Sequence, residues 1–434
     1  MNKGEVAELI RANEYKVPFK VWEFTPLDRA CLKMVIRGTW IFETQLDVGL
    51  MKEALAKTLS YYPHLAGRMS SQAGVTLTNE GVRFVSSAEP ELTVEEVLER
   101  NDANNISNFS VGINAGRFSK GLDSPLSVKV TRLKNGTVLG VQCSHACMDG
   151  DSFYTLVYNW GQICRNEAFD IPLLDQSLLP VAEDLPVAEI RAAALEAGWQ
   201  QLSIFSIFRL LPAVLSGVIK KRSTPFWVSA ETITRLKELV LKTTGIQGST
   251  NLVLAAFITK RCLELYKHQQ NTRCSFVTVV NTRKRLAGIP LNYAGNSSLS
   301  IATPAFAAGT SFAEIAAMIE ETLKPVRQSP SLKLMALMKL NLNSMKYKLP
   351  FAPFDVFGMY ARKPTTIYLN NFSKLHIYDI NFGSGEPVRV IPHDLGDQIV
   401  IWPAPPDKGG VAVYFTGIPT LYLRGLQDDY FNSL

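Results

Sequence analysis

A histidine and an aspartate lie four residues apart in the segment CSHACMDGDS, which covers residues 143–152. The imidazole of His145 titrates near neutral pH, so it could take a proton from a hydroxyl or an amine that attacks a carbonyl carbon. Such a base must be held in one orientation, and Asp149 could do this by fixing the turn. Gly150 would then permit a backbone geometry that a larger side chain forbids. These residue types at this spacing favour acid–base chemistry.

A strand and a helix are expected on either side of this turn. Residues 124–144 form two apolar runs around Asn135-Gly136, which is the pattern of a β-hairpin. Beyond the turn, Ser152 can cap a helix, and apolar residues from Phe153 to Cys164 recur at the spacing of an amphipathic helix. A strand-to-helix turn exposes side chains while rigid elements hold them. This context supports a catalytic role, although a polar turn with no catalytic role is the simpler alternative.

Other catalytic patterns do not occur in the sequence. Ser144 precedes the histidine, but there is no G-x-S-x-G nucleophile elbow, which disfavours a serine hydrolase. Neither the phosphate-binding motif G-x-x-x-x-G-K-[ST] nor the dinucleotide fingerprint G-x-G-x-x-G occurs. Six cysteines and five histidines include no C-x-x-C pair. We therefore expect no metal site and no disulfide framework.

Composition limits the class of protein. The chain has 434 residues, of which 47% are hydrophobic and 19% are charged, so two domains with full cores are expected. A net charge of +6 suits an anionic small ligand but is too weak to indicate a nucleic-acid partner. The most apolar stretch, 204–219, is interrupted by Arg209 and Pro212, which argues against stable membrane insertion. We expect a cytoplasmic, reduced protein.

The order of predicted elements suggests two α/β halves. We expect an N-terminal domain over 1–195 that carries the histidine, a crossover linker over 196–225 and a C-terminal domain over 226–434. Helices and strands alternate in both halves, which favours an α/β fold. Ligands often bind where two such halves meet.

Segments along most of the chain resemble the BAHD acyl-CoA-dependent acyltransferases, whose mark is HxxxD followed by glycine. The resemblance is carried by HACMDG at 145–150, FTPLDRACLKMVIRGTWIFE at 24–43, MKEALAKTLSYYPHLAGRM at 51–69, GVRFVSSAEPELTVEEVL at 81–98, VVNTRKRL at 279–286, YAGNSS at 293–298 and NFGSGEP at 381–387. These segments occur in the family's order, so the set is far more specific than the histidine motif alone.

The resemblance implies both a fold and a reaction. The expected fold is two chloramphenicol-acetyltransferase-like domains, each a mixed β-sheet flanked by helices, with a channel between them. His145 would be the general base on an alcohol or amine of a small-molecule acceptor. The acceptor would attack the acyl-CoA thioester directly and CoA thiolate would leave. The resemblance implies acyl-CoA as co-substrate, no other cofactor and no metal, a monomer, and a role in specialised metabolism.

The resemblance also implies supporting roles for other residues. The motif aspartate of the family points away from the substrate and pairs with an arginine, which would be Asp149 with Arg283 here, and Gly150 would support the same loop. Asn370 and Phe372 take the place of the family's T-S-W segment. Asn370 could then donate to the oxyanion and Phe372 could line the thioester pocket, although both could equally be ordinary strand residues.

The clearest departure from the family is in its DFGWG segment. Here an asparagine replaces the acid and a serine replaces the tryptophan, in the order Asn381, Phe382, Gly383, Ser384, Gly385. This segment is expected to be structural, so the change predicts a distant member rather than an inactive one.

Two alternatives stay open. The first is a condensation-type enzyme that takes acyl groups from a carrier-protein thioester, although Ser144 stands where such enzymes usually have a second histidine. The second is a degenerate member that binds a ligand without catalysis, which Asn381 and Ser384 leave open. Release of free thiol from acyl-CoA in the presence of alcohols or amines would separate these from the acyl-CoA-dependent enzyme.

Overall fold

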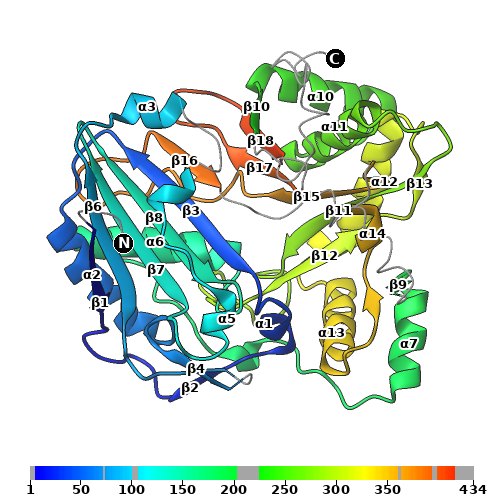
Figure 1. Cartoon of the computed structure of the whole chain (residues 1–434). Helices are drawn as coiled ribbons and strands as arrows, with labels where there is room; N and C mark the ends of the chain where they lie inside the picture. Colours follow the sequence, from blue (N-terminus) through cyan, green and yellow to red (C-terminus); the bar gives the residue numbers. More distant parts are fainter. Residues whose placement is uncertain are drawn as a thin grey trace. The chain divides into compact units, whose positions relative to one another are not determined.

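The computed structural model of the chain describes residues 5–71, 74–99, 106–202, 224–359, 363–392 and 398–415 (Figure 1). Most of the expected linker over 196–225, including the apolar stretch 204–219, lies outside these described residues. Contacts divide the chain into two compact units. Unit 1 comprises Met1–Gln176, Pro290–Ser297 and Leu375–Leu395, and unit 2 comprises Ser177–Ile289, Ser298–Lys374 and Gly396–Leu434. Two late segments of the sequence therefore belong to unit 1.

Unit 1 is built on a six-stranded mixed sheet in the order β1-β6-β7-β8-β3-β16. Its strands are β1 (Val6–Ile10), β6 (Val82–Glu89), β7 (Leu126–Leu133), β8 (Thr137–Ser144), β3 (Val35–Phe42) and β16 (Arg389–Pro392). Only β6 and β7 pair in parallel; the other pairs in this sheet are antiparallel. The expected hairpin around Asn135-Gly136 is confirmed as β7 and β8. All eight residues of β8 are buried, as expected for a central strand.

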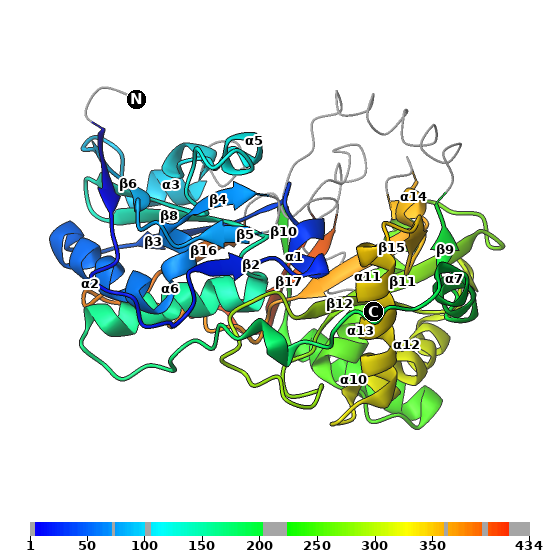
Figure 2. The same cartoon turned by 90° about the horizontal axis from the view of Figure 1, so that it is seen from below.

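Helices cover the unit 1 sheet. They are α1 (Pro26–Ala30), α2 (Val48–Tyr61), α3 (Val94–Glu99), α5 (Ala115–Phe118) and α6 (Gly150–Cys164), and a small sheet of β2 (Val21–Glu23), β5 (Gly74–Thr76) and β4 (Arg68–Ser71) completes the unit. Figure 2 shows α6 on one side of the main sheet, with α3 and α5 on the other. Trp160 of α6 donates its indole N–H to the carbonyl of Met51 in α2 at 2.9 Å, which joins the two long helices.

The amphipathic helix after the histidine begins slightly earlier than the sequence suggested. We expected Ser152 to be its cap, but α6 begins at Gly150 and Asp149 is the N-cap. An aspartate side chain at this position accepts from an otherwise unpaired N–H of the first turn, which a serine three residues later cannot do.

Unit 2 has a mixed sheet in the order β10-β18-β17-β15-β11-β12, with β13 beside β11. Its strands are β10 (Thr224–Val228), β18 (Val411–Phe415), β17 (Ile399–Pro403), β15 (Thr366–Asn371), β11 (Arg273–Asn281), β12 (Ser298–Ala302) and β13 (Phe306–Ala307). The parallel partners of β15 are β11 and β17. Helices α10 (Ala230–Thr244), α11 (Thr250–Leu265) and α12 (Phe312–Arg327) pack on one another, as Figure 1 shows.

Unit 2 also has elements outside its main sheet and these three helices. They are α7 (Val187–Glu196), α13 (Leu332–Lys346), α14 (Val356–Met359) and the two-stranded sheet of β9 (Gln200–Gln201) and β14 (Phe351–Ala352). Within the ranges that the structure describes, no helix combines the length and the apolar character needed to cross a membrane.

Candidate active site

His145 lies in the turn that joins β8 to α6, as the sequence predicted. Its backbone N–H donates to the carbonyl of Met34 at 2.9 Å, which ties the turn to the segment between α1 and β3. The imidazole is partly exposed, whereas the three residues that follow it, Ala146 to Met148, are buried. The chain therefore presents this one side chain at the end of a buried strand.

Asn296 determines which nitrogen of the imidazole carries the proton. The Oδ1 atom of Asn296 lies 3.1 Å from Nδ1 of His145. The Nδ2 atom donates both of its hydrogens, one to Oδ1 of Asp28 at 2.7 Å and one to the carbonyl of His145 at 2.8 Å. Since the amide nitrogen is fully used as a donor, Oδ1 must accept from an Nδ1–H. The lone pair of the neutral imidazole is then on Nε2, where it can act as a base.

Asp28 supports this arrangement by holding the side chain of Asn296. It is buried at 1% exposure, and it closes a capping box at the start of α1 by accepting from the N–H and hydroxyl of Thr25, both at 2.8 Å. Burial raises the pKa of Asp28 to about 6, although hydrogen bonds from Asn296 and Thr25 act in the opposite direction. At neutral pH the carboxylate can therefore anchor Asn296, and through it the imidazole.

Cys31 is linked to the histidine turn through the backbone of Met34. It is the C-cap residue of α1, and its carbonyl accepts from the N–H of Met34 at 2.9 Å. Burial lowers the pKa of His145, but the neighbouring Cys31 and Asp149 raise it, and the resulting pKa is about 9.

The pH dependence of acyl transfer should reflect this pKa. A general base works only when it is unprotonated, so kcat/KM should rise with pH up to about 9 in the wild type. The charged or titratable neighbours of the imidazole are Cys31, Asp149 and Asp28. Cys31→Ala removes the strongest of the raising partners, so the rising limb should move down by about one pH unit or more. A limb that stays in place in the kcat/KM profile would show that Cys31 does not control the base.

Removal of the asparagine should slow catalysis more than it weakens binding. Asn296→Ala leaves Nδ1 of His145 without its acceptor, so we expect kcat to fall by about 10- to 100-fold, a part of what a general base contributes. KM for acyl-CoA should change little. Asn292→Ala is a matched control in the same segment, since that amide donates to the carbonyl of Ile171 at 2.8 Å instead. Equal kcat values for the two variants would contradict the positioning role.

The carboxylate of Asp149 is buried and accepts backbone hydrogen bonds. The residue is 3% exposed; its Oδ1 accepts from the N–H of Ser152 at 3.1 Å and its Oδ2 from the N–H of Ser297 at 2.9 Å. It thereby joins the start of α6 to the segment that carries Asn296. Gly150 is the first residue of α6 and has helical backbone geometry, so its conformation does not itself demand glycine.

Three predicted site residues of the C-terminal half lie in unit 2. Arg283 follows β11, is 2% exposed and donates from Nη1 to Oδ1 of Asn281 at 3.1 Å. Asn370 lies in β15, and strand register places it on the same sheet face as Asn281. Phe372 packs edge-to-face on Trp402 with ring centroids 5.7 Å apart. The pairing of Arg283 with Asp149 stays a prediction.

The DFGWG-like segment forms a tight turn in unit 1. Asn381 Oδ1 accepts from the N–H of Gly383 at 2.7 Å and of Gly385 at 3.2 Å, and both glycines have φ above +100°. Such values strain any residue with a Cβ. Phe382 is buried against Trp160 of α6, with ring centroids 4.8 Å apart. Here asparagine supplies the acceptor that the turn requires.

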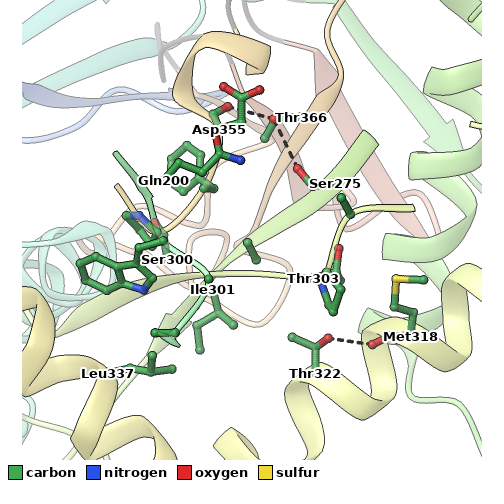
Figure 3. Close-up of a pocket in the computed structure, with 18 of the residues that line it drawn as sticks. Gln200, Ser275, Ser300, Ile301, Thr303, Met318, Thr322, Leu337, Asp355 and Thr366 are labelled. Carbon is green, nitrogen blue, oxygen red and sulfur yellow. Dashed lines mark hydrogen bonds between the residues drawn. The ribbon is translucent and has the colours of Figure 1, made fainter. Parts of the chain in front are cut away.

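Unit 2 also contains a cavity of about 740 Å³ (Figure 3). Its walls include the edge strand β12, helices α12 and α13 and the residues around Trp199. At one end, Ser275 Oγ lies 3.4 Å from Thr366 Oγ1, which in turn donates to the carbonyl of Asp355 at 2.9 Å. The walls of this cavity come from segments far apart in the chain, and no spacing in the sequence links them.

Asp28 and Asn296 form the hydrogen-bonded chain to His145 that sequence reasoning missed. Both lie in segments that resemble the family, in PLDRA and YAGNSS, but no local spacing connects residues 28, 145 and 296. In the part of the chain that the structure describes, no group of three or more His, Cys, Asp or Glu side chains is placed to hold a metal ion.

Comparison with known proteins identifies relatives over most of the chain. The model of the Transferase family matches residues 30–430. Hydroxycinnamoyltransferase 1 of Oryza sativa subsp. japonica is 27% identical over 375 residues, which cover 79% of this chain and 77% of that enzyme. Hydroxycinnamoyl-CoA:5-hydroxyanthranilate N-hydroxycinnamoyltransferase HHT1 of Avena sativa is 26% identical over 371 residues, covering 80% and 78% respectively.

Solved structures share the fold. Vinorine synthase aligns with a TM-score of 0.70 at 18% identity, over 98% of both chains. TRI101 of F. graminearum, complexed with coenzyme A and T-2 mycotoxin, aligns with a TM-score of 0.72 at 16% identity, over 92% of this chain and 95% of that one. The predicted α/β fold of two chloramphenicol-acetyltransferase-like domains is thereby confirmed. With the family match, these findings show that the chain belongs to the BAHD acyltransferases of the Transferase family and is an acyl-CoA-dependent acyltransferase.

Proposed function

We propose that the enzyme moves an acyl group from acyl-CoA to a hydroxyl or amine of a small molecule, with Nε2 of His145 as the general base. The observation that carries this is the chain of hydrogen bonds from Asp28 through Asn296 to Nδ1 of His145. It fixes the ring orientation and leaves the Nε2 lone pair for the acceptor's proton. A partly exposed imidazole at the end of a buried strand is accessible to such an acceptor.

The proposed reaction has two proton transfers. Nε2 takes the proton of the acceptor O–H or N–H while the acceptor attacks the thioester carbonyl, and a tetrahedral oxyanion forms. The oxyanion then collapses, the C–S bond breaks, and the CoA thiolate receives the proton from His145. We assign the side-chain N–H of Asn370 to the oxyanion and Phe372 to the wall of the thioester pocket. No acyl-enzyme and no metal takes part in this route.

The names of relatives suggest which substrates to try first. Relatives include hydroxycinnamoyltransferases, an omega-hydroxypalmitate O-feruloyl transferase of Arabidopsis thaliana and a stemmadenine O-acetyltransferase of Catharanthus roseus. We infer that the donor is an aromatic or short-chain acyl-CoA and that the acceptor is an alcohol or amine of specialised metabolism. We also propose that the enzyme is a cytoplasmic monomer.

An acyl-transfer screen tests the proposed function. The purified protein is offered acetyl-, malonyl-, benzoyl-, hydroxycinnamoyl- and medium-chain acyl-CoA with pooled alcohols and amines, and free thiol and product masses are recorded. We expect thiol release that depends on an acceptor and yields the matching ester or amide. Thiol release at the same rate without acceptor would indicate hydrolysis, and no release from any donor would contradict the use of acyl-CoA.

A further inference from the structure

The cavity in unit 2 is large enough for a small-molecule ligand. Its volume of about 740 Å³ lies within the usual range of such sites, which is about 300–1,000 Å³. The wall is formed by parts of β11, β12 and β15 together with α12, α13 and the residues around Trp199 and Phe354. All of these segments belong to unit 2, so the cavity is formed within one unit.

One end of the cavity is lined by oxygen atoms that accept hydrogen bonds. The hydroxyl of Thr366 donates to the carbonyl of Asp355 at 2.9 Å. Since this bond uses its one hydrogen, the 3.4 Å contact between Ser275 Oγ and Thr366 Oγ1 must use the hydrogen of Ser275. The carboxylate of Asp355, whose Oδ1 accepts from the N–H of Gly358 at 3.0 Å, lies at the same end (Figure 3). A carboxylate accepts up to about four hydrogen bonds, so this end favours a ligand that donates them.

The opposite end of the cavity has the same character. Thr322 of α12 donates its hydroxyl hydrogen to the carbonyl of Met318 at 2.8 Å, which leaves the oxygen lone pairs for a ligand. Between the two ends, Ser300 of β12 lies 2.9 Å from the hydroxyl of Tyr368. A ligand with several O–H groups therefore matches the wall along its length.

The charged residues of the wall are nearly balanced. Its acidic residues are Glu196, Glu321 and Asp355, and its basic residues are Arg273 and Lys333. Arg273 lies two residues before Ser275, so the alternation of a strand places both on the same face of β11. A positive charge close to the Asp355 end disfavours an ammonium ligand there, and the carboxylate disfavours an anion. A neutral ligand with hydroxyl donors fits best.

Aromatic rings complete the wall. Trp199, which is 6% exposed, and Phe354 both line the cavity. Phe354 also packs against Tyr368, with ring centroids 5.4 Å apart. A sugar ring carries hydroxyl donors around its rim and C–H groups on its faces that pack against aromatic rings, so it matches both kinds of surface.

Strand β15 connects the cavity to the residue assigned to the oxyanion. Thr366, Tyr368 and Asn370 alternate along this strand, so their side chains share one face of the sheet. Asn370 follows Thr366 by four residues, which is about 13 Å at the rise of a strand. An acceptor whose reacting hydroxyl lies at Asn370 therefore reaches the cavity with a group about 13 Å away from that hydroxyl.

We propose that the cavity binds the sugar of a glycosylated acceptor, with sugar hydroxyls that donate to Asp355 and Ser275, and that a hydroxyl of the aglycone is acylated. This assignment rests on the proposed function, since it places the reacting hydroxyl at Asn370. The aglycone O–H gives its proton to His145, its oxygen forms the ester bond, the C–S bond of the thioester breaks, and CoA leaves as the free thiol. The sugar takes no part in the bond changes and only holds the acceptor in place.

Binding of two matched probes to the full-length enzyme tests the site without catalysis. The probes are para-(hydroxymethyl)phenyl β-glucoside and its aglycone, para-hydroxybenzyl alcohol, each titrated by calorimetry. The glucoside should bind at least about tenfold more tightly, because the sugar adds hydrogen bonds to a carboxylate. Equal affinities would overturn the proposal, as would tighter binding of the cationic analogue para-hydroxybenzylamine than of the glucoside.

Variants of the wall identify the residues that bind the sugar. Asp355→Asn should weaken glucoside binding by about tenfold or more and leave aglycone binding unchanged, and it keeps an oxygen for the N–H of Gly358. Ser275→Ala, at a partly exposed position, should weaken glucoside binding by about 3- to 10-fold. Asp407→Asn is the matched control, because it is the same substitution at an exposed residue of unit 2 outside the cavity wall. Wild-type glucoside affinity in both cavity variants would overturn the proposal.

Acyl transfer to the same probes separates this proposal from the proposed function. If the enzyme acylates both probes equally well and binds the glucoside no more tightly, the sugar site is wrong and the transferase function stands. If the glucoside binds through Asp355 but no acyl group passes from any donor to any acceptor, the sugar site stands and the proposed function is wrong.

Discussion

His145→Ala should reduce kcat for acyl transfer by about 100- to 10,000-fold, the usual contribution of a positioned general base. The imidazole is partly exposed, and of its ring nitrogens Nδ1 bonds to Asn296 at 3.1 Å. Loss of that bond should reduce the free energy of unfolding by only about 1 kcal/mol. The variant should therefore have a melting temperature close to that of the wild type, although its kcat is strongly reduced.

A second histidine in unit 1 provides the control for this experiment. His376 is exposed and lies 2.6 Å from Asp379 through Nδ1, with no part in the Asp28–Asn296 chain. His376→Ala should retain wild-type kcat within about twofold. The exposed ion pair that it removes contributes little to the stability of the fold. Equal turnover in wild type and His145→Ala would exclude this histidine as the base. A melting temperature that falls steeply in His145→Ala would instead assign it a structural role.

The parts of the site that depend on residues adjacent in sequence could be predicted from the sequence. The hairpin over 124–144 and the helix from Gly150 follow from local patterns, and the structure confirms both. The cap of that helix was misplaced by three residues, because Asp149 and Ser152 are both good capping residues and the pattern alone does not choose between them. The start of a helix is decided by which side chain reaches the free N–H groups.

The partners of the histidine could not be read in this way. Asn296 reaches His145 across 151 residues and Asp28 across 268 residues, and such pairs leave no periodic or spacing signal. The segment 290–297 belongs to unit 1 although it lies between two stretches of unit 2 in sequence. A prediction based on the order of elements places it with its neighbours.

Asp149→Ala should lower the free energy of unfolding by about 2–4 kcal/mol and slow catalysis as well. The substitution removes the N-cap of α6, which contributes about 1 kcal/mol. It also leaves the N–H of Ser297 without the carboxylate that accepts it at 2.9 Å, and an unsatisfied buried donor costs about 1–3 kcal/mol. Because Ser297 adjoins Asn296, the imidazole should lose part of its orientation. Denaturant unfolding and kcat measured on the same preparation check both effects.

The predicted pairing of Asp149 with Arg283 implies a larger loss of unfolding free energy for the same variant. A buried charge that loses its partner costs about 3–5 kcal/mol, so a paired Asp149 would give a loss near the upper end of the range or above it. The double-mutant cycle of Asp149→Ala and Arg283→Ala isolates this interaction from the capping bonds. A coupling free energy of about 1 kcal/mol or more would support the pair, and additive effects would exclude it. Asp149→Asn refines the result, since it keeps one carbonyl oxygen for capping and removes only the charge that Arg283 requires.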